Sequence, residues 1–254
     1  MSNTVKVKDI IIGEGIPKVC VPMVGRNLTQ LKEEGDMLKN IDFDVVEWRA
    51  DFFQDVEDTQ KVIEALHSIR EIFPTIPLLF TFRSAREGGE KEVTNSYYFS
   101  LIKEVVESNE VDLIDVELFL EEQHVKEIIS IAHQQNVFVI LSNHDFNKTP
   151  SKEEMISRLI RAQELGADIL KIAVMPNSTK DVLTLLEATE EMYTKHATQP
   201  IITMAMGDKG VISRLSGEVF GSAMTFGAAK NASAPGQLNV ADLKHILNLL
   251  HRSS

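Results

Sequence analysis

The sequence of 254 residues contains a single cysteine, Cys20, so no intramolecular disulfide can form. A lone thiol within an apolar run fits a reducing compartment and core packing rather than catalysis. Basic residues are also scarce: the formal net charge is −12, which repels nucleic acids and anionic membranes. No stretch approaches the roughly 18 apolar residues of a membrane span, and Met1–Lys8 contains no apolar signal core. We therefore expect a cytoplasmic protein with no nucleic-acid or membrane partner.

Two motif classes are missing. No G-x-G-x-x-G follows an apolar run, and neither Gly13-Glu-Gly15 nor Gly88-Gly89 stands in the context of a dinucleotide-binding turn. No group of His, Cys, Asp or Glu has the spacing of a zinc site, and Asn143-His-Asp145 alone is a weak signal. No Pro/Gly/Ser-rich linker divides the chain. One domain spanning residues 1–254, with no metal, is the expectation.

Apolar, strand-like runs alternate with helical patterns along the whole chain. The expected strands are 19–24, 45–49, 78–83, 113–117, 137–142, 169–174, 201–206 and 219–225. The expected helices are 28–38, 59–72, 96–106, 123–134, 152–165, 180–193, 211–215 and 240–250. This alternation predicts an α/β fold, a (β/α)8 TIM barrel, with a doubly wound open sheet as the alternative. Residues 5–12 predict a short N-terminal β-hairpin or plug, and Asn95 and Ser151 are expected to cap helices.

The segment 168–174 reads as a buried strand with a lysine at its centre. Alternation places Ile169, Lys171 and Ala173 on one face. Both faces are apolar apart from the lysine, as in a parallel strand covered on each side. Burial disfavours the ammonium and favours the neutral amine that Schiff-base chemistry requires. The alternatives are that Lys171 pairs with a carboxylate, or that its side chain extends out of the strand end to solvent.

The same alternation directs charged side chains into the barrel. The inward set near the ends of three strands is Glu47, Arg49, Thr81, Arg83, Asp115 and Glu117. Buried charges cost several kcal/mol each unless they are paired, and TIM-barrel enzymes build their sites at this end. His144, at the end of the fifth strand, is placed to move protons near neutral pH. A structural salt-bridge network and a hydrogen-bonded scaffold histidine are the respective alternatives.

Two loops complete this end of the barrel. Residues 83–90 carry two arginines, a carboxylate and a glycine pair, as a site for an anionic, hydroxylated ligand would. Residues 231–237 are small and include Pro and Gly, as in a mobile lid. A solvated loop and a plain connection are equally compatible with these two patterns.

Five motifs in order resemble type I 3-dehydroquinate dehydratase. They are Glu47-Trp-Arg49, Phe80-Thr-Phe-Arg-Ser-Ala-Arg-Glu-Gly-Gly89, Ser142-Asn-His-Asp-Phe146, Lys171-Ile-Ala-Val-Met175 and Ser233-Ala-Pro-Gly-Gln237. The likeness runs from about Lys18 to the C-terminus. It implies a TIM barrel, usually a homodimer, that acts in the shikimate route to aromatic compounds without a metal or an organic cofactor.

The resemblance also implies roles for residues. Lys171 would form an imine with the C3 ketone of 3-dehydroquinate, giving 3-dehydroshikimate after loss of water. His144 would remove the C2 proton and protonate the departing C1 hydroxyl, and Glu87 would orient His144. The remaining residues would bind substrate: Arg214 its carboxylate; Glu47, Arg49 and Arg83 its ring hydroxyls; Ser233 and Gln237 in the lid; Met206 and Phe226 as apolar walls. Pro22 departs from the serine of some members, which bears on affinity rather than on the reaction.

Two rivals stay open from the residues alone. Another Schiff-base lyase, such as a class I aldolase, would carry a Gly-rich phosphate cradle after the last two strands, where this chain has Arg214 and residues 233–237. A barrel that has lost activity would be expected to lack Lys171, His144 or Glu87. If His144 cycles between its protonation states, the rate should rise with pH near neutrality.

Overall fold

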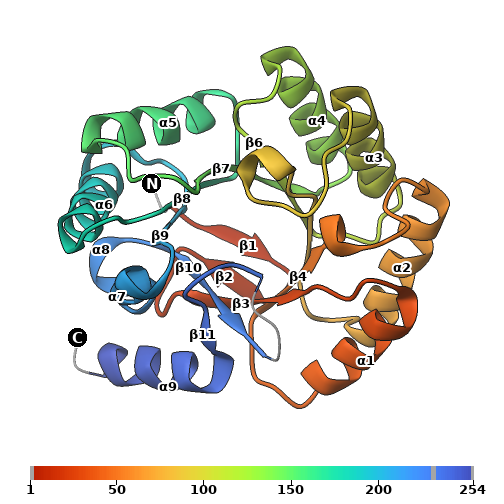
Figure 1. Ribbon diagram of the computed structural model, residues 1–254, viewed down its shortest axis with the longest axis horizontal. Helices are drawn as coiled ribbons and strands as arrows, with labels where there is room; N and C mark the ends of the chain where they lie inside the picture. The colour runs from red at the N-terminus through yellow and green to blue at the C-terminus, as the bar shows by residue number, and fades with distance from the viewer. Residues whose placement is uncertain (1–2, 230–232, 253–254) are drawn as a thin grey trace.

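The computed structural model describes residues 3–229 and 233–252, which form a ring of parallel strands surrounded by helices (Figure 1). The ring contains β3 (Lys18–Met23), β4 (Val45–Arg49), β5 (Leu78–Thr81), β6 (Leu113–Glu117), β7 (Phe138–Asp145), β8 (Ile169–Val174), β9 (Ile201–Ala205) and β10 (Met224–Ala228). From β3 to β9 each strand pairs in parallel with the next, and β10 pairs with β3. A bridge between Ile201 and Ser222 connects the remaining two neighbours. The predicted (β/α)8 barrel is confirmed.

The helices lie outside the ring, and the longer ones bury one apolar side against it. They are α1 (Leu28–Leu38), α2 (Thr59–Ile72), α3 (Asn95–Glu107), α4 (Glu122–Gln134), α5 (Lys152–Glu164), α6 (Thr179–Glu191), α7 (Val211–Leu215), α8 (Gly217–Phe220) and α9 (Val240–His251). Short turns η1 (Ala50–Phe52), η2 (Ala85–Glu87), η3 (Met192–His196) and η4 (Asp208–Gly210) follow β4, β5, α6 and β9, and β11 (Leu238–Asn239) pairs with β10. Ser151 caps α5 as predicted, by accepting from the backbone N–H of Glu154. Thr94, not Asn95, caps α3, because the Thr94 hydroxyl accepts from Tyr97 N.

One predicted strand was wrong in its first half. Val219 and Phe220, expected to open a strand over 219–225, belong to the short helix α8. Val219 is 67% exposed, which a strand covered on both faces would not allow. The chain turns at Gly221, and β10 starts at Met224.

Alternation along the strands sorts the core into two layers. The outward side chains, such as Val46, Trp48 and Phe80, pack with the helices. The inward ones, such as Val45 and Leu79, form a second cluster inside the ring. The predicted face of each strand is therefore confirmed.

A small antiparallel hairpin fills the inside of the barrel at one end. It consists of β1 (Val5–Val7) and β2 (Ile10–Ile12), and it lies across the centre of the ring in Figure 1. Val5, Val7 and Ile12 are buried against the inner cluster. The expected plug is confirmed, and it leaves the carboxyl ends of the strands for a site.

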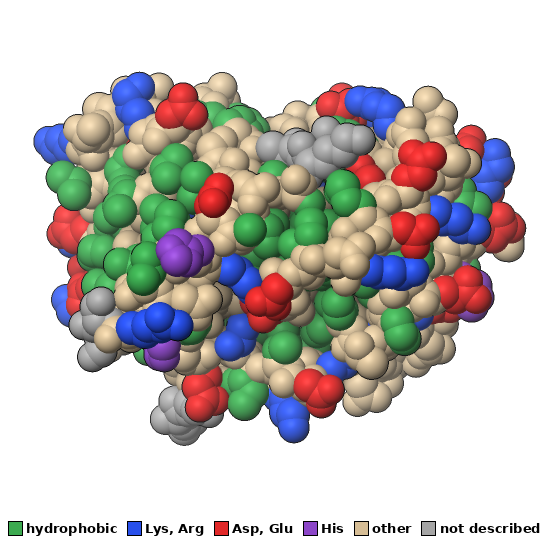
Figure 2. Space-filling view, turned by 90° about the horizontal axis from the view of Figure 1, so that it is seen from below, with side chains coloured by type: hydrophobic (Ala, Val, Ile, Leu, Met, Phe, Trp, Pro, Cys, Tyr) green, Lys and Arg blue, Asp and Glu red, His purple; other side chains and the backbone are tan. Residues whose placement is uncertain are grey.

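One face of the molecule shows no strong segregation of charge (Figure 2). On the face in Figure 2, acidic and basic side chains are interspersed with hydrophobic ones. Within the described part of the chain, no helix combines the length and the apolar character needed to cross a membrane.

Candidate active site

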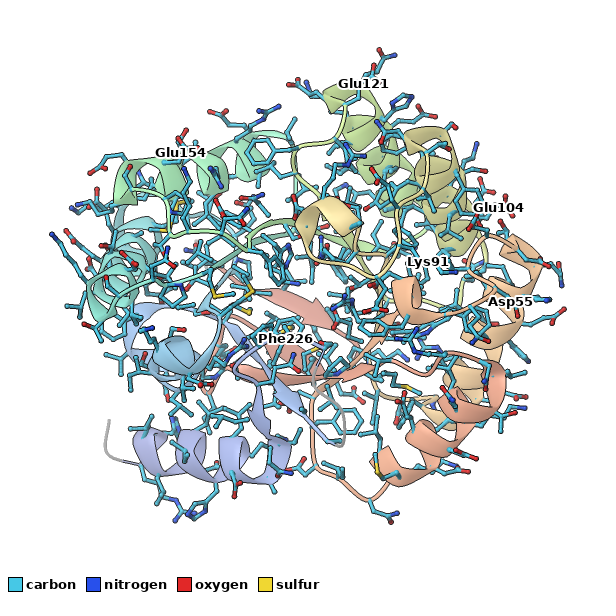
Figure 3. The ribbon with its side chains drawn as sticks, in the orientation of Figure 1. Asp55, Lys91, Glu104, Glu121, Glu154 and Phe226 are labelled. Atoms are coloured by element: carbon cyan, nitrogen blue, oxygen red, sulfur yellow. The ribbon has the colours of Figure 1, made fainter. Side chains whose placement is uncertain are left out.

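A cavity opens at the carboxyl ends of the strands. Of the residues predicted for the site, it is lined by Glu47, Arg49, Arg83, Glu87, His144, Lys171, Met206, Phe226, Ser233 and Gln237. Phe226 lies near the centre of the ring (Figure 3). Arg214 is the predicted site residue that the cavity wall does not include. Four strands, β4, β7, β8 and β10, supply Glu47, Arg49, His144, Lys171 and Phe226, and the other side chains come from segments that follow β5, β9 and β10.

Lys171 projects from the middle of β8 into the barrel, with a side chain only 4% exposed. Its Nζ donates a hydrogen bond to Asp115 Oδ2 at 2.9 Å and lies 4.7 Å from the centre of the Phe226 ring. The predicted burial is present, and so is the carboxylate partner that the sequence left open. This ion pair compensates the lysine for part of the hydration lost on burial.

Asp115 connects the amine to two further donors. Its Oδ1 accepts from Arg83 Nη2 and from Ser142 Oγ, both at 2.6 Å. Complete burial opposes ionisation of this carboxyl, but Arg83 and Lys171 outweigh burial and lower the pKa of Asp115. Asp115 is therefore a fixed anion on which the position of Nζ depends.

Arg83 is held among three carboxylates. Besides Asp115, its Nη1 donates to Glu117 Oε1 at 3.1 Å and lies 3.6 Å from Glu87 Oε2. Burial would lower the pKa of Arg83, but these three carboxylates raise it above its usual value. The guanidinium is thus a permanent positive charge in the cavity wall.

Glu87 and His144 form a hydrogen-bonded pair. His144 Nδ1 lies 2.9 Å from Glu87 Oε2, which also accepts from the backbone N–H of His144. Burial, assisted by the positive charges of Arg83 and Lys171, holds the pKa of His144 well below its usual value. Burial raises the pKa of Glu87 to about 7, against the opposing effect of Arg83. From the sequence we expected a rise in rate near neutral pH from His144. These pKa shifts instead indicate Glu87 as the group that titrates in that range.

The loop after β5 depends on its two glycines to place Glu87. Gly88 has φ +83°, and a Cβ there would collide with the Phe146 ring. A Cβ on Gly89 would collide with the carbonyl of Arg83. The pair, expected to orient a ligand, has a conformational role: the chain reverses tightly enough to direct Glu87 back towards β7.

Arg49 and Glu47 come from β4. Arg49 makes a two-pronged ion pair with the fully buried Asp51, with both N–O distances 2.8 Å, and donates to the Ser233 carbonyl at 3.2 Å. Glu47 accepts from Thr81 Oγ1 at 2.9 Å. Asp51 was not predicted, because it lies in a turn where strand alternation gives no information.

Arg214, on α7, is 1% exposed and has no carboxylate partner among the described residues. Its Nη2 donates to the Pro235 carbonyl at 3.1 Å, Nη1 lies 3.5 Å from Met204 Sδ, and Nε has no partner in that part of the structure. Burial lowers the pKa of Arg214 to about 10. A buried cation without an anion is unfavourable by itself, and it sits directly behind the cavity-lining Met204.

Residues 233–237 cover the cavity. Ser233 and Gln237 bond to each other twice, through Ser233 N to Gln237 Oε1 at 2.8 Å and Gln237 Nε2 to Ser233 Oγ at 3.1 Å. The Pro235 carbonyl also accepts from Gly207 N. Asn231 and Ala232, expected in the same lid, lie outside the described residues.

Cys20 is buried inside the barrel, where burial and the nearby Glu47 carboxylate raise the pKa of its thiol, so it is a packing residue. Among residues 3–229 and 233–252, no three His, Cys, Asp or Glu side chains are grouped as a metal ion would need.

Comparison with known proteins gives one family. The family model described as type I 3-dehydroquinase matches residues 19–254. The chain is 60% identical to a 3-dehydroquinate dehydratase of Clostridium novyi, with 98% of each chain covered. It is 61% identical to that of Listeria monocytogenes, covering 98% of this chain and 99% of the relative.

Solved structures agree. The type I 3-dehydroquinate dehydratase of Clostridium difficile, solved with covalently modified comenic acid, superposes with a TM-score of 0.97 at 56% identity over 100% of both chains. The 3-dehydroquinate dehydratase of Geobacillus kaustophilus gives 0.96 at 39% identity, covering 99% and 97%. A 3-hexulose-6-phosphate synthase of Salmonella typhimurium, at 16% identity and a TM-score of 0.61 over 92% and 99%, shares the fold alone.

Proposed function

Because this chain belongs to the type I 3-dehydroquinase family and is therefore a hydro-lyase, we propose that it removes water from 3-dehydroquinate through an imine on Lys171. The observation that carries the proposal is the cavity itself. Its wall contains the buried amine of Lys171 and the hydrogen-bonded pair of His144 and Glu87. The buried guanidinium of Arg214, which has no carboxylate partner among the described residues, lies behind the wall. A covalently modified ligand in the Clostridium difficile relative is in keeping with a covalent route.

The first stage is attack of Lys171 Nζ on the C3 ketone. The ammonium held by Asp115 must first lose a proton, and the neutral imidazole of His144 is the acceptor. Addition gives a carbinolamine, and the protonated His144 returns its proton to the carbinolamine hydroxyl, which leaves as water to give a protonated imine. The positive charge is thereby restored to the same nitrogen, beside Asp115.

The second stage is elimination. The protonated imine accepts the electron pair released when His144 removes the C2 proton, giving an enamine. The enamine electrons then expel the C1 hydroxyl, which His144 protonates as it leaves. Glu87 accepts the Nδ1–H of His144, so that Nε2 is free to carry the proton in both steps. Hydrolysis of the imine releases 3-dehydroshikimate and regenerates the amine.

The surrounding residues fix the substrate. We assign its carboxylate to Arg214, whose planar guanidinium suits two parallel hydrogen bonds. Glu47, Arg49 and Arg83 face the cavity and are assigned to the ring hydroxyls. Met206 and Phe226 form apolar walls, and Ser233 and Gln237 close over the bound ring, which keeps water out and strengthens the electrostatic interactions.

Reduction of the imine tests this mechanism. The protein is mixed with 3-dehydroquinate, borohydride is added, and the modified peptide is mapped by mass spectrometry, with Lys171→Met as the control. We expect one adduct on Lys171 and none in the variant, which should fold normally and lose activity. An adduct on another residue, or normal turnover without any adduct, would overturn the mechanism.

We also propose that the chain folds as one domain, forms a homodimer and serves the shikimate route in the cytoplasm. The dimer is supported by exposed apolar side chains on neighbouring helices at the left of Figure 1: Leu183 on α6, Ile212 on α7 and Val219 on α8. Light scattering should give twice the 28.5 kDa of one chain. Val219→Asp should lower this mass, and a wild-type mass of one chain would contradict the dimer.

A further inference from the structure

Asn143 is a polar residue in an apolar layer. It precedes His144 on β7 and points outwards, on the same face as Val139 and Leu141, which pack against the helices. Asn143 is only 5% exposed. A carboxamide at such a position is unfavourable unless both its ends are hydrogen-bonded.

Both ends of Asn143 are bonded, and to different partners. Its Oδ1 accepts from Arg158 Nη1 on α5 at 2.7 Å, and its Nδ2 donates to Glu87 Oε1 at 3.1 Å. A guanidinium can only donate, so Arg158 fixes the orientation of the amide and turns its NH2 group towards Glu87. A chain of hydrogen bonds therefore runs from the outer helix through Asn143 and Glu87 to the imidazole of His144.

We propose that Arg158 and Asn143 are positioning residues that keep Glu87 an acceptor towards His144, and thereby set the lower pH limit of the reaction. This inference rests on the proposed function. Neither residue was selected from the sequence, because the side chain of Asn143 points away from the barrel interior and Arg158 lies on a helix.

The chemistry of the pair explains why the acceptor state matters. An ionised Glu87 accepts the Nδ1–H of His144 and leaves Nε2 free to take a proton. A protonated Glu87 would donate to Nδ1 instead, which places the hydrogen on Nε2 and removes the base. With the pKa of Glu87 raised by burial to about 7, the two states are close in energy, and the hydrogen bond from Asn143 favours the ionised one.

Several charged groups act on Glu87 from the elements around it. These are Arg83 after β5 and Asp115 and Glu117 on β6, while the titratable His144 on β7 and Lys171 on β8 line the same cavity. Asn143 differs from them in being neutral, and its orientation depends on Arg158. A substitution of Arg158 therefore changes Glu87 without altering any charge in the cavity wall.

Helix α5 offers a matched control. The Arg158 guanidinium lies 5.4 Å from the centre of the Phe119 ring and bonds to Glu154, which lies at the outer side of α5 in Figure 3. Arg161 on the same helix lies 5.7 Å from the same ring and pairs with Glu122. Substituting Arg161 removes the same charge and a similar ring contact but leaves the amide of Asn143 in place.

The experiment measures kcat/KM between pH 5.5 and 9.5 for wild type, Arg158→Met, Arg158→Lys, Asn143→Ala and Arg161→Met. In Arg158→Met and Asn143→Ala, the midpoint of the rise in activity should move to higher pH by up to about one unit. Activity should fall up to about tenfold near pH 6 and approach wild type near pH 9. Arg158→Lys, which keeps a donor, should restore part of the profile, and Arg161→Met should match wild type.

A loss of activity that is equal at all pH values, or an unmoved midpoint in Arg158→Met, would overturn the inference. If Asn143→Ala does not fold, Arg158→Met decides, because Arg158 is partly exposed. Nitrogen-15 NMR of the His144 ring gives a second readout: Arg158→Met should increase the tautomer with hydrogen on Nε2 near pH 7, and an unchanged ring spectrum would count against the proposal. A wild-type protein inactive on 3-dehydroquinate would instead reject the proposed function.

Discussion

Replacing Arg214 by methionine should make the protein more stable and much less active. Burial lowers the pKa of Arg214 to about 10, roughly 2.5 units below the usual value of an arginine. At about 1.4 kcal/mol per unit, the charged guanidinium costs the folded state about 3 kcal/mol at all pH values below 10. The cost would diminish only as the pH rises above 10, where the neutral form becomes populated.

The stability gained by removing the charge of Arg214 is partly offset by the loss of a hydrogen bond. The hydrogen bond from Arg214 to the Pro235 carbonyl stabilises the fold by about 1.5 kcal/mol. Methionine has similar length and no charge, so the free energy of unfolding should increase by about 1–2 kcal/mol. In the complex, loss of the charged pair with the substrate carboxylate should cost about 3 kcal/mol, which is more than a hundredfold in kcat/KM.

Urea denaturation measures the first effect and steady-state kinetics the second. Trp48 is the single tryptophan and is fully buried, so its fluorescence reports unfolding. Arg70→Met is the matched control: Arg70 pairs with Asp112 at 2.6 Å, so this variant should lose about 1–3 kcal/mol of stability and keep its activity. A lower free energy of unfolding in Arg214→Met would refute the claim that the unpaired charge destabilises the fold. An unchanged kcat/KM would refute the assignment of the substrate carboxylate to Arg214.

Further substitutions test the two buried carboxylates. Glu87→Gln should lower kcat by about a hundredfold and abolish the rise in rate near pH 7. The two carboxylate oxygens of Glu87 accept from Asn143 and from His144, and an amide would replace one of these acceptors by an NH2 group that faces a donor. A pH–rate profile like that of wild type would contradict this. Asp115→Asn leaves Arg83 and Lys171 without their shared anion and should cost about 3–5 kcal/mol in urea denaturation. Trapping with borohydride should also slow in Asp115→Asn, and a variant as stable as wild type would show that the ion pairs contribute nothing.

Strand alternation explains why much of the barrel and its inward side chains could be predicted. A period of two places Lys171, Glu47 and His144 on the inner face wherever the strand boundaries fall within a residue or two. The same argument placed Asp115 and Glu117 inside the barrel. It could not predict which side chains they would pair with, because pairing depends on distances across the ring. Here the sequence left the protonation of the amine open, and the structure pairs it with Asp115.

The failures have different physical causes. Val219 and Phe220 make an apolar pair, yet a helix of one turn gives no periodicity by which to recognise it. Asp51 lies in a turn, where alternation gives no information, and Asn143 points to the outer face of β7, whose partners on the helices and in the loop after β5 are set by the fold. Glu87 was placed by resemblance alone, since its position depends on the reversal at Gly88 and Gly89.

The hairpin that fills the barrel floor has a consequence for the order of folding. Strands β1 and β2 emerge from the ribosome well before β10, which closes the ring against β3. Val5, Val7 and Ile12 thus remain without their full set of neighbours until β10 has been synthesised. Contacts so distant in sequence slow folding, so these apolar side chains stay exposed in the nascent chain until the ring closes around them.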